Sequence, residues 1–425
     1  MALLPVEEAL ARLLASAQPL QKTEDLPLAA ARGRILAAPV TARLTQPPFD
    51  ASAMDGYALR ATDAAEPGAI LELVGESAAG HGFDGTVQAG QCVRIFTGAP
   101  MPAGADTVLL QEDAEKMEDG RVLARIAVPL NRHIRPRGQD FAEGDQLLTP
   151  GTQLDFRNLT LAAAANQPTL TVYRKPLLAI LATGDELVLP GARPGASQII
   201  ASNTFGIAAL AEENGADVLD LGLVKDDRAA IADAVRRAQQ AGADVLVTVG
   251  GASVGDHDLV GAALQDAGMV LDFWKIAMRP GKPLMVGRLE CFQEKWEPVF
   301  RPETGENLPI STPVLGLPGN PVSSMVCSLL FLEPLLAHLG HRQPPKRLDV
   351  ARSAVTLKAN DQRQDYLRGR LTADADGAWV AEPFGKQDSS MTRILASADC
   401  LIIRPPHAPE LPAGNLCPIL RIGQL

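Results

Sequence analysis

The feature that most constrains the fold is an alternation of apolar runs and helix-like stretches between Lys175 and Leu336. Continuous apolar runs are typical of strands buried on both faces, and the stretches between them carry helix start and stop signals. Residues 177–182 form a continuous apolar run, and the further predicted strands cover residues 217–224, 245–249, 282–286 and 313–317. Strands that alternate with helices predict a doubly wound parallel α/β sheet with helices on both faces.

The segments that flank this alternation have a different texture. Apolar groups at helical spacing in residues 6–14 predict an amphipathic helix. From about Thr45, prolines, glycines and short apolar runs predict a β-rich unit that ends near Asp140. After Pro345, short alternating runs with frequent turns predict a small β-barrel or sandwich. The polar stretch 289–312 interrupts the α/β rhythm, and we interpret it as a surface insertion.

Charge and cysteine usage exclude several classes of function. The formal net charge is −11, from 39 Lys and Arg against 50 Asp and Glu, so the chain has no general attraction to nucleic acid or anionic lipid. Its five scattered cysteines are typical of free thiols in a reducing compartment. Glu7 and Glu8 stand where a signal peptide would be basic, and the apolar stretch 325–332 is too short to span a bilayer. We therefore expect a cytoplasmic protein that binds neither membranes nor nucleic acid.

Four loops follow the carboxyl ends of the predicted strands, where a doubly wound sheet binds its ligands. Glycine-rich loops that lead into helices let backbone N–H groups approach a phosphate. Each loop carboxylate taken alone is more often a helix cap. Together they form an acidic rim that suits Mg²⁺ bridging carboxylates and substrate phosphates. The loops cover residues 183–186, 224–227, 250–258 and 317–321, and the acidic candidates are Glu186, Asp226, Asp227, Asp256 and Asp258.

Basic residues are expected near the same edge of the sheet. Lys275 precedes the run 279–283, in which Pro280 and Gly281 fix the backbone around Arg279 and Lys282. This favours aimed side chains over the plain alternative, a solvated basic turn. Three short motifs in the β-rich unit are weaker candidates, since the first of them also suits a simple hairpin turn. They carry Asp55, Thr97, Arg135 and Asp140.

Seven strings of residues occur in an order that resembles one known family. They are PPFDASAMDGYA, RIFTGAPMPAGAD, RPRGQD, ATGDEL, GGASVGDHD, MRPGKP and GLPGNPVS, and they span Pro47 to Ser323. The chain resembles the molybdopterin molybdenumtransferases, called MoeA in bacteria, and the E domain of gephyrin. The predicted N-terminal helix and C-terminal β segment extend this resemblance to nearly the whole chain.

The resemblance implies four domains. They are a helical linking domain (1–45 with 141–175), a β-rich inserted domain (46–140), an α/β molybdopterin-binding-like domain (176–340) and a C-terminal β-barrel (341–425). It also implies a homodimer and a Mg²⁺-dependent reaction in molybdenum cofactor biosynthesis. Molybdate and adenylylated molybdopterin are the substrates, and AMP is released. The molybdopterin adenylyltransferase and molybdoenzyme-maturation proteins are candidate partners.

The motif alignment assigns three groups of residues. The catalytic residues would be Asp55, Asp140, Glu186, Asp258, Lys275 and Lys282. The metal ligands would be Asp226, Asp258 and Glu186. Substrate would contact Thr97, Arg135, Gly250, Gly251, Ser253, Arg279, Pro318, Gly319, Asn320, Pro321 and Ser389.

Two departures from the family pattern leave alternatives open. Arg279 stands where relatives often carry lysine, which keeps the charge and changes the geometry. The segment after Asp258 is one residue longer than usual, so Asp256 competes for the role of Asp258. Two other functions also remain. An adenylyltransferase shares the GGxS and PGNP loops but would lack the β-rich unit, and a gephyrin-like scaffold would need no catalytic residues.

Overall fold

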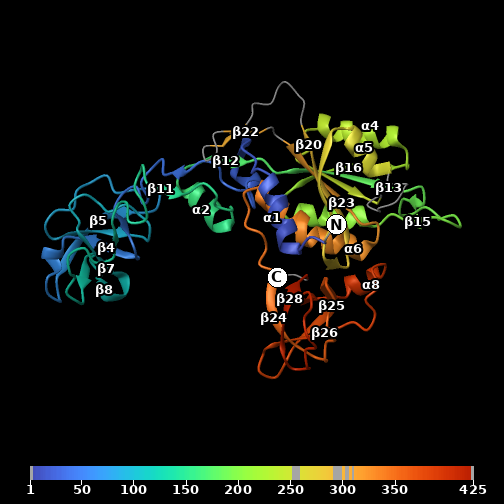
Figure 1. Ribbon diagram of the computed structural model, residues 1–425. Helices are drawn as coiled ribbons and strands as arrows, with labels where there is room; N and C mark the ends of the chain where they lie inside the picture. Colours follow the sequence, from blue (N-terminus) through green and yellow to red (C-terminus); the bar gives the residue numbers. More distant parts are fainter. Residues whose placement is uncertain (1–2, 251–258, 291–298, 302–305, 309–310, 423–425) are drawn as a thin grey trace. The chain divides into compact units, whose positions relative to one another are not determined.

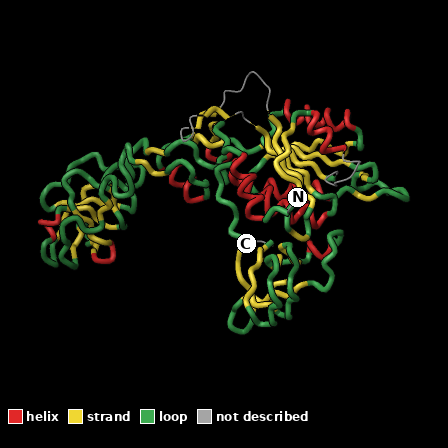
Figure 2. Tube along the Cα trace, viewed as in Figure 1, coloured by secondary structure: helices red, strands yellow, loops and turns green. Residues whose placement is uncertain are grey.

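The computed structural model describes residues 3–250, 259–290, 299–301, 306–308 and 311–422. The chain divides into two compact units, Met1–Glu24 with Tyr173–Leu425, and Asp25–Val172. Strands β1 (Thr23–Pro27) and β12 (Thr169–Tyr173) carry the chain from one unit to the other. Figures 1 and 2 show the helices and strands of each unit.

The larger unit is built on a six-stranded sheet. Its strand order is β16-β13-β17-β23-β20-β18, and the first four strands run parallel. The expected α/β fold is confirmed, with one difference, since β20 runs antiparallel to both of its neighbours. The short segment 276–282 joins β18 to β20 as a hairpin, and a parallel return needs a longer crossover. The strands are β13 (Leu177–Thr183), β16 (Asp217–Val224), β17 (Val245–Val249), β18 (Met269–Lys275), β20 (Pro283–Glu290) and β23 (Ser311–Leu317).

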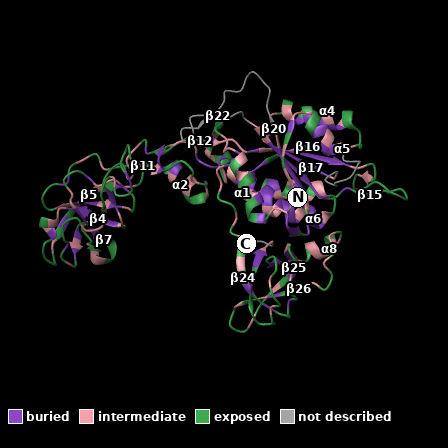
Figure 3. Cartoon of the chain, in the orientation of Figure 1, coloured by how far each residue is buried: buried purple, intermediate pink, exposed green. Residues whose placement is uncertain are grey.

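Helices cover both faces of this sheet because its strands are apolar on both faces. Leu178 and Ile180 of β13 pack into the core beneath α1, α3, α6 and α7, whereas Ala179 and Leu181 face α4 and α5. Successive side chains of a strand point to opposite faces, so a continuous apolar run serves two cores. The buried strands are drawn in purple in Figure 3. The helices are α1 (Val6–Ser16), α3 (Asn203–Glu213), α4 (Arg228–Gln240), α5 (Leu259–Asp266), α6 (Pro321–Cys327) and α7 (Glu333–Leu339).

One helical stretch in the described part of the chain is long and apolar enough to cross a membrane. It covers Pro321–Leu339, in which the π-helical turn Ser328–Leu332 joins α6 to α7, and 72% of its most apolar window is buried inside the protein. Its buried side chains include Val326, Phe331 and Leu335, which belong to the same core as β13. The buried core helix of a globular protein has this length and composition, so the stretch is weak evidence for a membrane span.

The predicted surface insertion is partly a strand pair. Strands β20 and β23 extend into it with Leu289 paired to Thr312, and β21 (Val299–Arg301) pairs with β22 (Glu306–Leu308). Upstream, the short strands β14 (Leu187–Val188) and β15 (Ile199–Ile200) pair in parallel after the loop that follows β13.

The C-terminal part forms the expected small β-barrel. Strands β25, β26, β24, β28 and β27 pair in that order, and β27 pairs back onto β25 and closes the barrel. The strand β19 (Met278–Arg279) joins the barrel by pairing with the start of β25. The remaining elements are β24 (Leu348–Ser353), β25 (Gln364–Ala373), β26 (Trp379–Pro383), α8 (Thr392–Ala396), β27 (Cys400–Arg404) and β28 (Leu416–Arg421).

The smaller unit is β-rich, as expected. Its main sheet has the order β7-β4-β6-β5-β9-β8. Gly56 of β4 lies so close to β7 that an added Cβ would sit 2.0 Å from the Leu109 carbonyl oxygen, so the DGYA motif needs glycine there. The helix α2 (Phe156–Ala164) begins with a capping box made by Asp155 and Asn158. The strands are β2 (Val40–Thr41), β3 (Ala51–Ser52), β4 (Gly56–Leu59), β5 (Ile70–Ser77), β6 (Gln91–Ile95), β7 (Thr107–Leu110), β8 (Ala114–Lys116), β9 (Val122–Ala124), β10 (Ile134–Arg135) and β11 (Gln146–Leu148). The boundaries of the four predicted domains stay a prediction.

Candidate functional site

The loops after β13, β17 and β23 converge at the carboxyl edge of the sheet. A Cβ at Gly250 would lie 2.5 Å from the Thr183 carbonyl oxygen, and one at Gly319 would lie 3.9 Å from the Gly250 Cα. Asn203, at the start of α3, donates a hydrogen bond of 2.8 Å from Nδ2 to the Gly319 carbonyl oxygen. Gly250 therefore needs to be glycine, whereas an added Cβ at Gly319 would make only ordinary contact, and the two turns lie close together.

An acidic cluster lies at the same edge. Burial, together with the charges of Asp185 and Glu186, raises the pKa of Asp226 above the usual aspartate value, although the Asp185 backbone N–H opposes this. The Glu186 carboxylate folds back over Gly184, where an added Cβ would meet its Oε2 at 2.6 Å. Like charges held together without a counter-ion raise the free energy of their ionised forms. A bound divalent cation would relieve this repulsion.

The donor set at this cluster fits Mg²⁺, which prefers oxygen ligands. Within the described residues, no group of three His, Cys, Asp or Glu side chains is gathered closely enough to hold a metal. The third predicted ligand, Asp258, lies outside the described residues, as do its rival Asp256 and the predicted substrate contacts Gly251 and Ser253. Glu186 and Asp226 are thus the described part of the predicted metal site.

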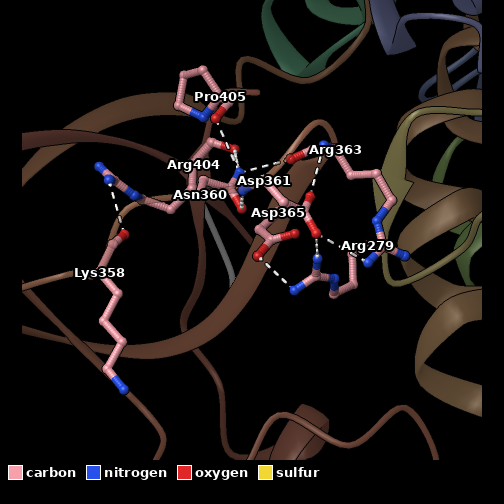
Figure 4. A network of polar contacts seen from close by, with 8 residues as sticks. All are labelled: Arg279, Lys358, Asn360, Asp361, Arg363, Asp365, Arg404 and Pro405. Atoms are coloured by element: carbon pink, nitrogen blue, oxygen red, sulfur yellow. Dashed lines mark hydrogen bonds and ion pairs between the residues drawn. The ribbon is translucent and has the colours of Figure 1, made fainter. Parts of the chain in front are cut away.

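Three basic residues lie on or beside the hairpin that links β18 to β20. The Ile276 N–H donates to the Lys282 carbonyl oxygen at 3.1 Å, and Lys275 is paired with Pro283 across the two strands. Lys282 is exposed and Lys275 is half-buried. Arg279 differs from both, because its guanidinium contacts Asp361 and lies 3.4 Å from Asp365, both carboxylates of the barrel (Figure 4).

The loop that carries Ser389 is brought to the start of α6. The Val322 N–H donates to the Ser389 carbonyl oxygen at 3.0 Å, which places this barrel loop beside the Pro318–Pro321 turn. A residue absent from the sequence analysis supports the loop. Arg368 is 1% exposed and donates from Nη2 to the Asp388 carbonyl oxygen at 3.0 Å. Its strand, QDYLRGRLTA, holds several polar residues, so no signal in the sequence showed that this arginine is buried with a specific partner.

In the smaller unit, Asp55 and Thr97, which belong to separate motifs, are in contact. The Thr97 backbone N–H and its hydroxyl each donate to Asp55 Oδ1 at 2.7 Å. These two hydrogen bonds, with a smaller effect from the charge of Arg94, lower the pKa of Asp55 below the usual aspartate value. Asp55 is therefore ionised at neutral pH, and one of its two oxygens is already occupied.

Arg94 is a second residue that sequence reasoning missed. It donates to the Gly56 carbonyl oxygen at 2.9 Å, and its guanidinium lies over the rings of Tyr57 and Phe96, with 5.1 and 4.8 Å to their centroids. Its place in the RIFTGAP motif could have pointed to it, because Arg94 lies on β6, which pairs with the strand β4 that follows Asp55. Its contacts fix the β4 end of the Asp55 turn.

Arg135, in the short strand β10, and Asp140, in the bend that follows it, belong to the same unit and are exposed. Arg135 pairs with Ala51 across β10 and β3, and the Asp140 N–H donates to the Gln46 carbonyl oxygen at 3.0 Å. The backbone of Arg135 is thus tied to the PPFDASAMDGYA segment, and that of Asp140 to the residue just before it. Their side chains are left available for a ligand.

Replacing Thr97 by valine is expected to raise the pKa of Asp55 towards its ordinary value. The change removes the hydroxyl donor and keeps the backbone N–H, so the shift should be partial. Carboxylate NMR titration of Asp55 measures it directly. Thr97→Ser keeps the hydroxyl and should leave the pKa as it is; an equal pKa in the valine variant and the wild type would contradict the assignment.

The fold and the two clusters define a class of protein. A part-parallel α/β sheet with glycine turns and carboxylates at its carboxyl edge is accompanied by a β-barrel and a β-rich unit. The family described as a probable molybdopterin binding domain matches residues 179–338. The MoeA N-terminal region (domain I and II) matches residues 4–166, and the MoeA C-terminal region (domain IV) matches residues 350–422.

Whole-chain relatives agree with these matches. A molybdopterin molybdenumtransferase of Nostoc sp. is 37% identical over 91% of this chain and 85% of its own length. The Haemophilus influenzae protein of that name is 34% identical over 97% of both chains. The crystal structure of a molybdopterin biosynthesis MoeA protein from Pyrococcus horikosii superimposes with a TM-score of 0.81 at 27% identity and covers both chains fully. The chain therefore belongs to the MoeA family of molybdopterin molybdenumtransferases, as its motifs predicted.

Proposed function

We propose that the protein inserts molybdate into adenylylated molybdopterin in a Mg²⁺-dependent reaction that releases AMP. The observation that carries the proposal is the acidic cluster of Asp226, Asp185 and Glu186 beside close glycine turns at the carboxyl edge of the sheet. Relatives that match nearly the whole chain are named molybdopterin molybdenumtransferase, so the family supports a transferase of molybdenum cofactor biosynthesis.

Glu186, Asp226 and Asp258 would hold Mg²⁺ in this proposal, with Asp256 as the rival of Asp258. The ion, when bound, would polarise the phosphoanhydride of the adenylylated substrate. Residues of the chain would supply binding and charge. The glycine turns would admit phosphate oxygens to backbone N–H groups, and Lys275 and Lys282 would offset negative charge that develops on the leaving AMP. The further substrate contacts proposed are Gly250, Gly251, Ser253, Pro318, Gly319, Asn320, Pro321 and Ser389.

Asp55, Thr97, Arg135 and Asp140 are proposed to bind the end of the substrate that receives molybdenum. Because the lowered pKa keeps Asp55 ionised at neutral pH, its role is to accept hydrogen bonds and not to donate a proton. Arg135 would supply positive charge to molybdate.

The test is incubation of the purified protein with adenylylated molybdopterin, molybdate and MgCl₂, with AMP measured by chromatography. AMP release that requires both molybdate and Mg²⁺ supports the proposal. Tight binding of the adenylylated substrate without AMP release would instead support a scaffold. Consumption of ATP with free molybdopterin would identify an adenylyltransferase.

We further propose that the protein is a homodimer, which light scattering of the purified protein would test. We also propose that it is located in the cytoplasm. The adenylyltransferase of the same biosynthesis and molybdoenzyme-maturation proteins are the proposed protein partners.

A further inference from the structure

Arg279 has its charge matched within the protein. Its Nη2 contacts Asp361 Oδ2, and its Nη1 lies 3.4 Å from Asp365 Oδ2. The guanidinium thus bridges two carboxylates of the barrel, as Figure 4 shows. Neither Lys275 nor Lys282 forms an ion pair with another residue in the part of the chain that the structure describes. Lys275, Arg279 and Lys282, the three basic residues of the β18–β20 hairpin, therefore differ in the charge that they can offer to a ligand.

The Asp361 carboxylate is held by its own turn. Asp361 accepts from the Arg363 N–H at 2.9 Å, and its own N–H donates to Asn360 Oδ1 at 2.9 Å. Asn360 in turn donates from Nδ2 to the carbonyl oxygens of Arg363 and Arg404 at 2.7 and 2.9 Å. The turn is built from backbone contacts, so the Asp361 carboxylate stays in place without Arg279.

Asp365 depends on the arginine more strongly. It is 8% exposed, and its Oδ1 is buried with no hydrogen-bond partner among the described residues. A buried carboxylate without a nearby cation is costly. Arg279 is the basic group with the largest effect on Asp365, since its charge opposes the rise in pKa that burial causes. Removing Arg279 would therefore leave the Asp365 carboxylate buried without its main counter-ion and destabilise the start of β25.

Backbone contacts connect this ion-pair network to the hairpin that carries Lys282. The Gln364 N–H donates to the Ala277 carbonyl oxygen at 2.8 Å, and the Ile276 N–H donates to the Lys282 carbonyl oxygen at 3.1 Å. Arg279 itself pairs with Asp365 across β19 and β25. The planar guanidinium of arginine has donors on separate nitrogens and can bind both carboxylates at once, whereas a lysine ammonium is a single point charge.

We propose that Arg279 is a positioning residue, held by Asp361 and Asp365, which fixes the 276–282 hairpin against the barrel so that Lys275 and Lys282 meet the anionic substrate. The identity of that anion rests on the proposed function. Arg279 is on this view not a phosphate or molybdate contact, which departs from the role that the family resemblance implies.

Binding of adenylylated molybdopterin to five variants separates the two roles. We expect Arg279→Ala and Asp361→Ala each to weaken binding about tenfold through misplacement of the hairpin, and the double variant to be no worse than either. The dependence of Kd on salt above 0.15 M, where the screening length is about 8 Å or less, should stay as in the wild type for these variants. It should fall for Lys282→Ala. Arg279→Lys should recover part of the affinity.

A direct contact predicts the opposite pattern. Arg279→Ala would then reduce the salt dependence, and Asp361→Ala would tighten binding because it frees the arginine. Either result overturns the inference.

A second measurement needs no ligand and so separates this inference from the proposed function. We expect hydrogen exchange at the Ile276 and Gln364 amides to accelerate at least threefold in Arg279→Ala and in Asp361→Ala, with no further increase in the double variant. Arg288→Ala is the matched control. It breaks an Arg–Asp pair of 2.9 Å to Asp272 at the other end of the same two strands. Unchanged exchange at both amides overturns the positioning role, whatever substrate the protein uses.

Discussion

Asp226→Asn is expected to lower the rate of Mg²⁺-dependent AMP release by at least about 100-fold, the usual scale for loss of a group that stabilises charge in the transition state. The change removes one carboxylate of the acidic cluster and keeps the size of the side chain. Asparagine retains one oxygen ligand but no charge, so affinity for Mg²⁺ should fall as well. Single-turnover AMP release, measured across a Mg²⁺ titration, checks both effects.

The same substitution should slightly stabilise the fold when Mg²⁺ is absent. Because the pKa of Asp226 is raised in the folded state, the wild type loses stability as the pH rises from the ordinary aspartate pKa through the raised value. Asparagine does not titrate, so the variant escapes this loss. Thermal midpoints measured without Mg²⁺ should therefore differ little at acidic pH and favour the variant at neutral pH. Loss of activity together with a gain of stability would indicate that the like charges of the acidic cluster repel one another when no cation is bound.

Asp227→Asn is the matched control. Asp227 is the next residue, and its Oδ1 accepts the Ala230 N–H at 2.9 Å as the N-cap of α4. Asparagine caps helices as well as aspartate does, and the charge change is the same. AMP release should stay within about threefold of wild type, because a cap residue exerts no direct effect on charge in the transition state. If both variants lose activity equally, the local charge matters and the proposed ligand role of Asp226 is wrong.

Arg347→Ala is expected to lower the free energy of unfolding by about 3–5 kcal/mol, the cost of leaving a buried charge unpaired. Glu333, at the start of α7, is 2% exposed, and Arg347 holds it through two hydrogen bonds of 2.6 and 2.7 Å. Asn214, which ends α3, donates to the same carboxylate at 3.0 Å. The pair therefore joins two core helices to the segment that enters the barrel, where Arg347 also donates to the Arg421 carbonyl oxygen.

Urea denaturation followed by circular dichroism measures this effect. The double variant Glu333→Leu with Arg347→Met should recover most of the lost stability, because apolar residues of similar volume often replace a buried ion pair without cost. Arg228→Ala breaks the exposed pair with Asp266 and should cost no more than about 1 kcal/mol. A similar loss from Arg228→Ala and Arg347→Ala would show that burial of the Glu333 pair is not what stabilises this region.

Much of the fold follows from short-range patterns. Residues 177–182 were predicted as a strand from a continuous apolar run and fall within β13, and the predicted strands 217–224 and 245–249 are β16 and β17. The glycine turns at Gly250 and Gly319 were predicted to lie at one edge, because carboxyl ends of parallel strands share an edge of the sheet. The seven ordered motifs also predicted the family, since such strings record turn chemistry that is local in sequence.

The partners of charged side chains could not be predicted in this way. Arg279 was predicted to be a substrate contact, which stays a prediction, and its partner Asp361 lies 82 positions away in the sequence, in the loop before β25. Arg94 and Arg368 carry no periodic signal, and each becomes informative only through the oxygen atoms that the fold places beside it.

The sequence by itself determined the order of strands and helices, the positions of the glycine turns and the family, because hydrophobic periodicity and turn preferences act over a few residues. Only the tertiary structure decided the antiparallel direction of β20, the raised pKa of Asp226 and the commitment of Arg279 to two aspartates. Those features depend on which segments pack together, since strand pairing, burial and Coulomb energy are set by distances in space between residues far apart in the chain.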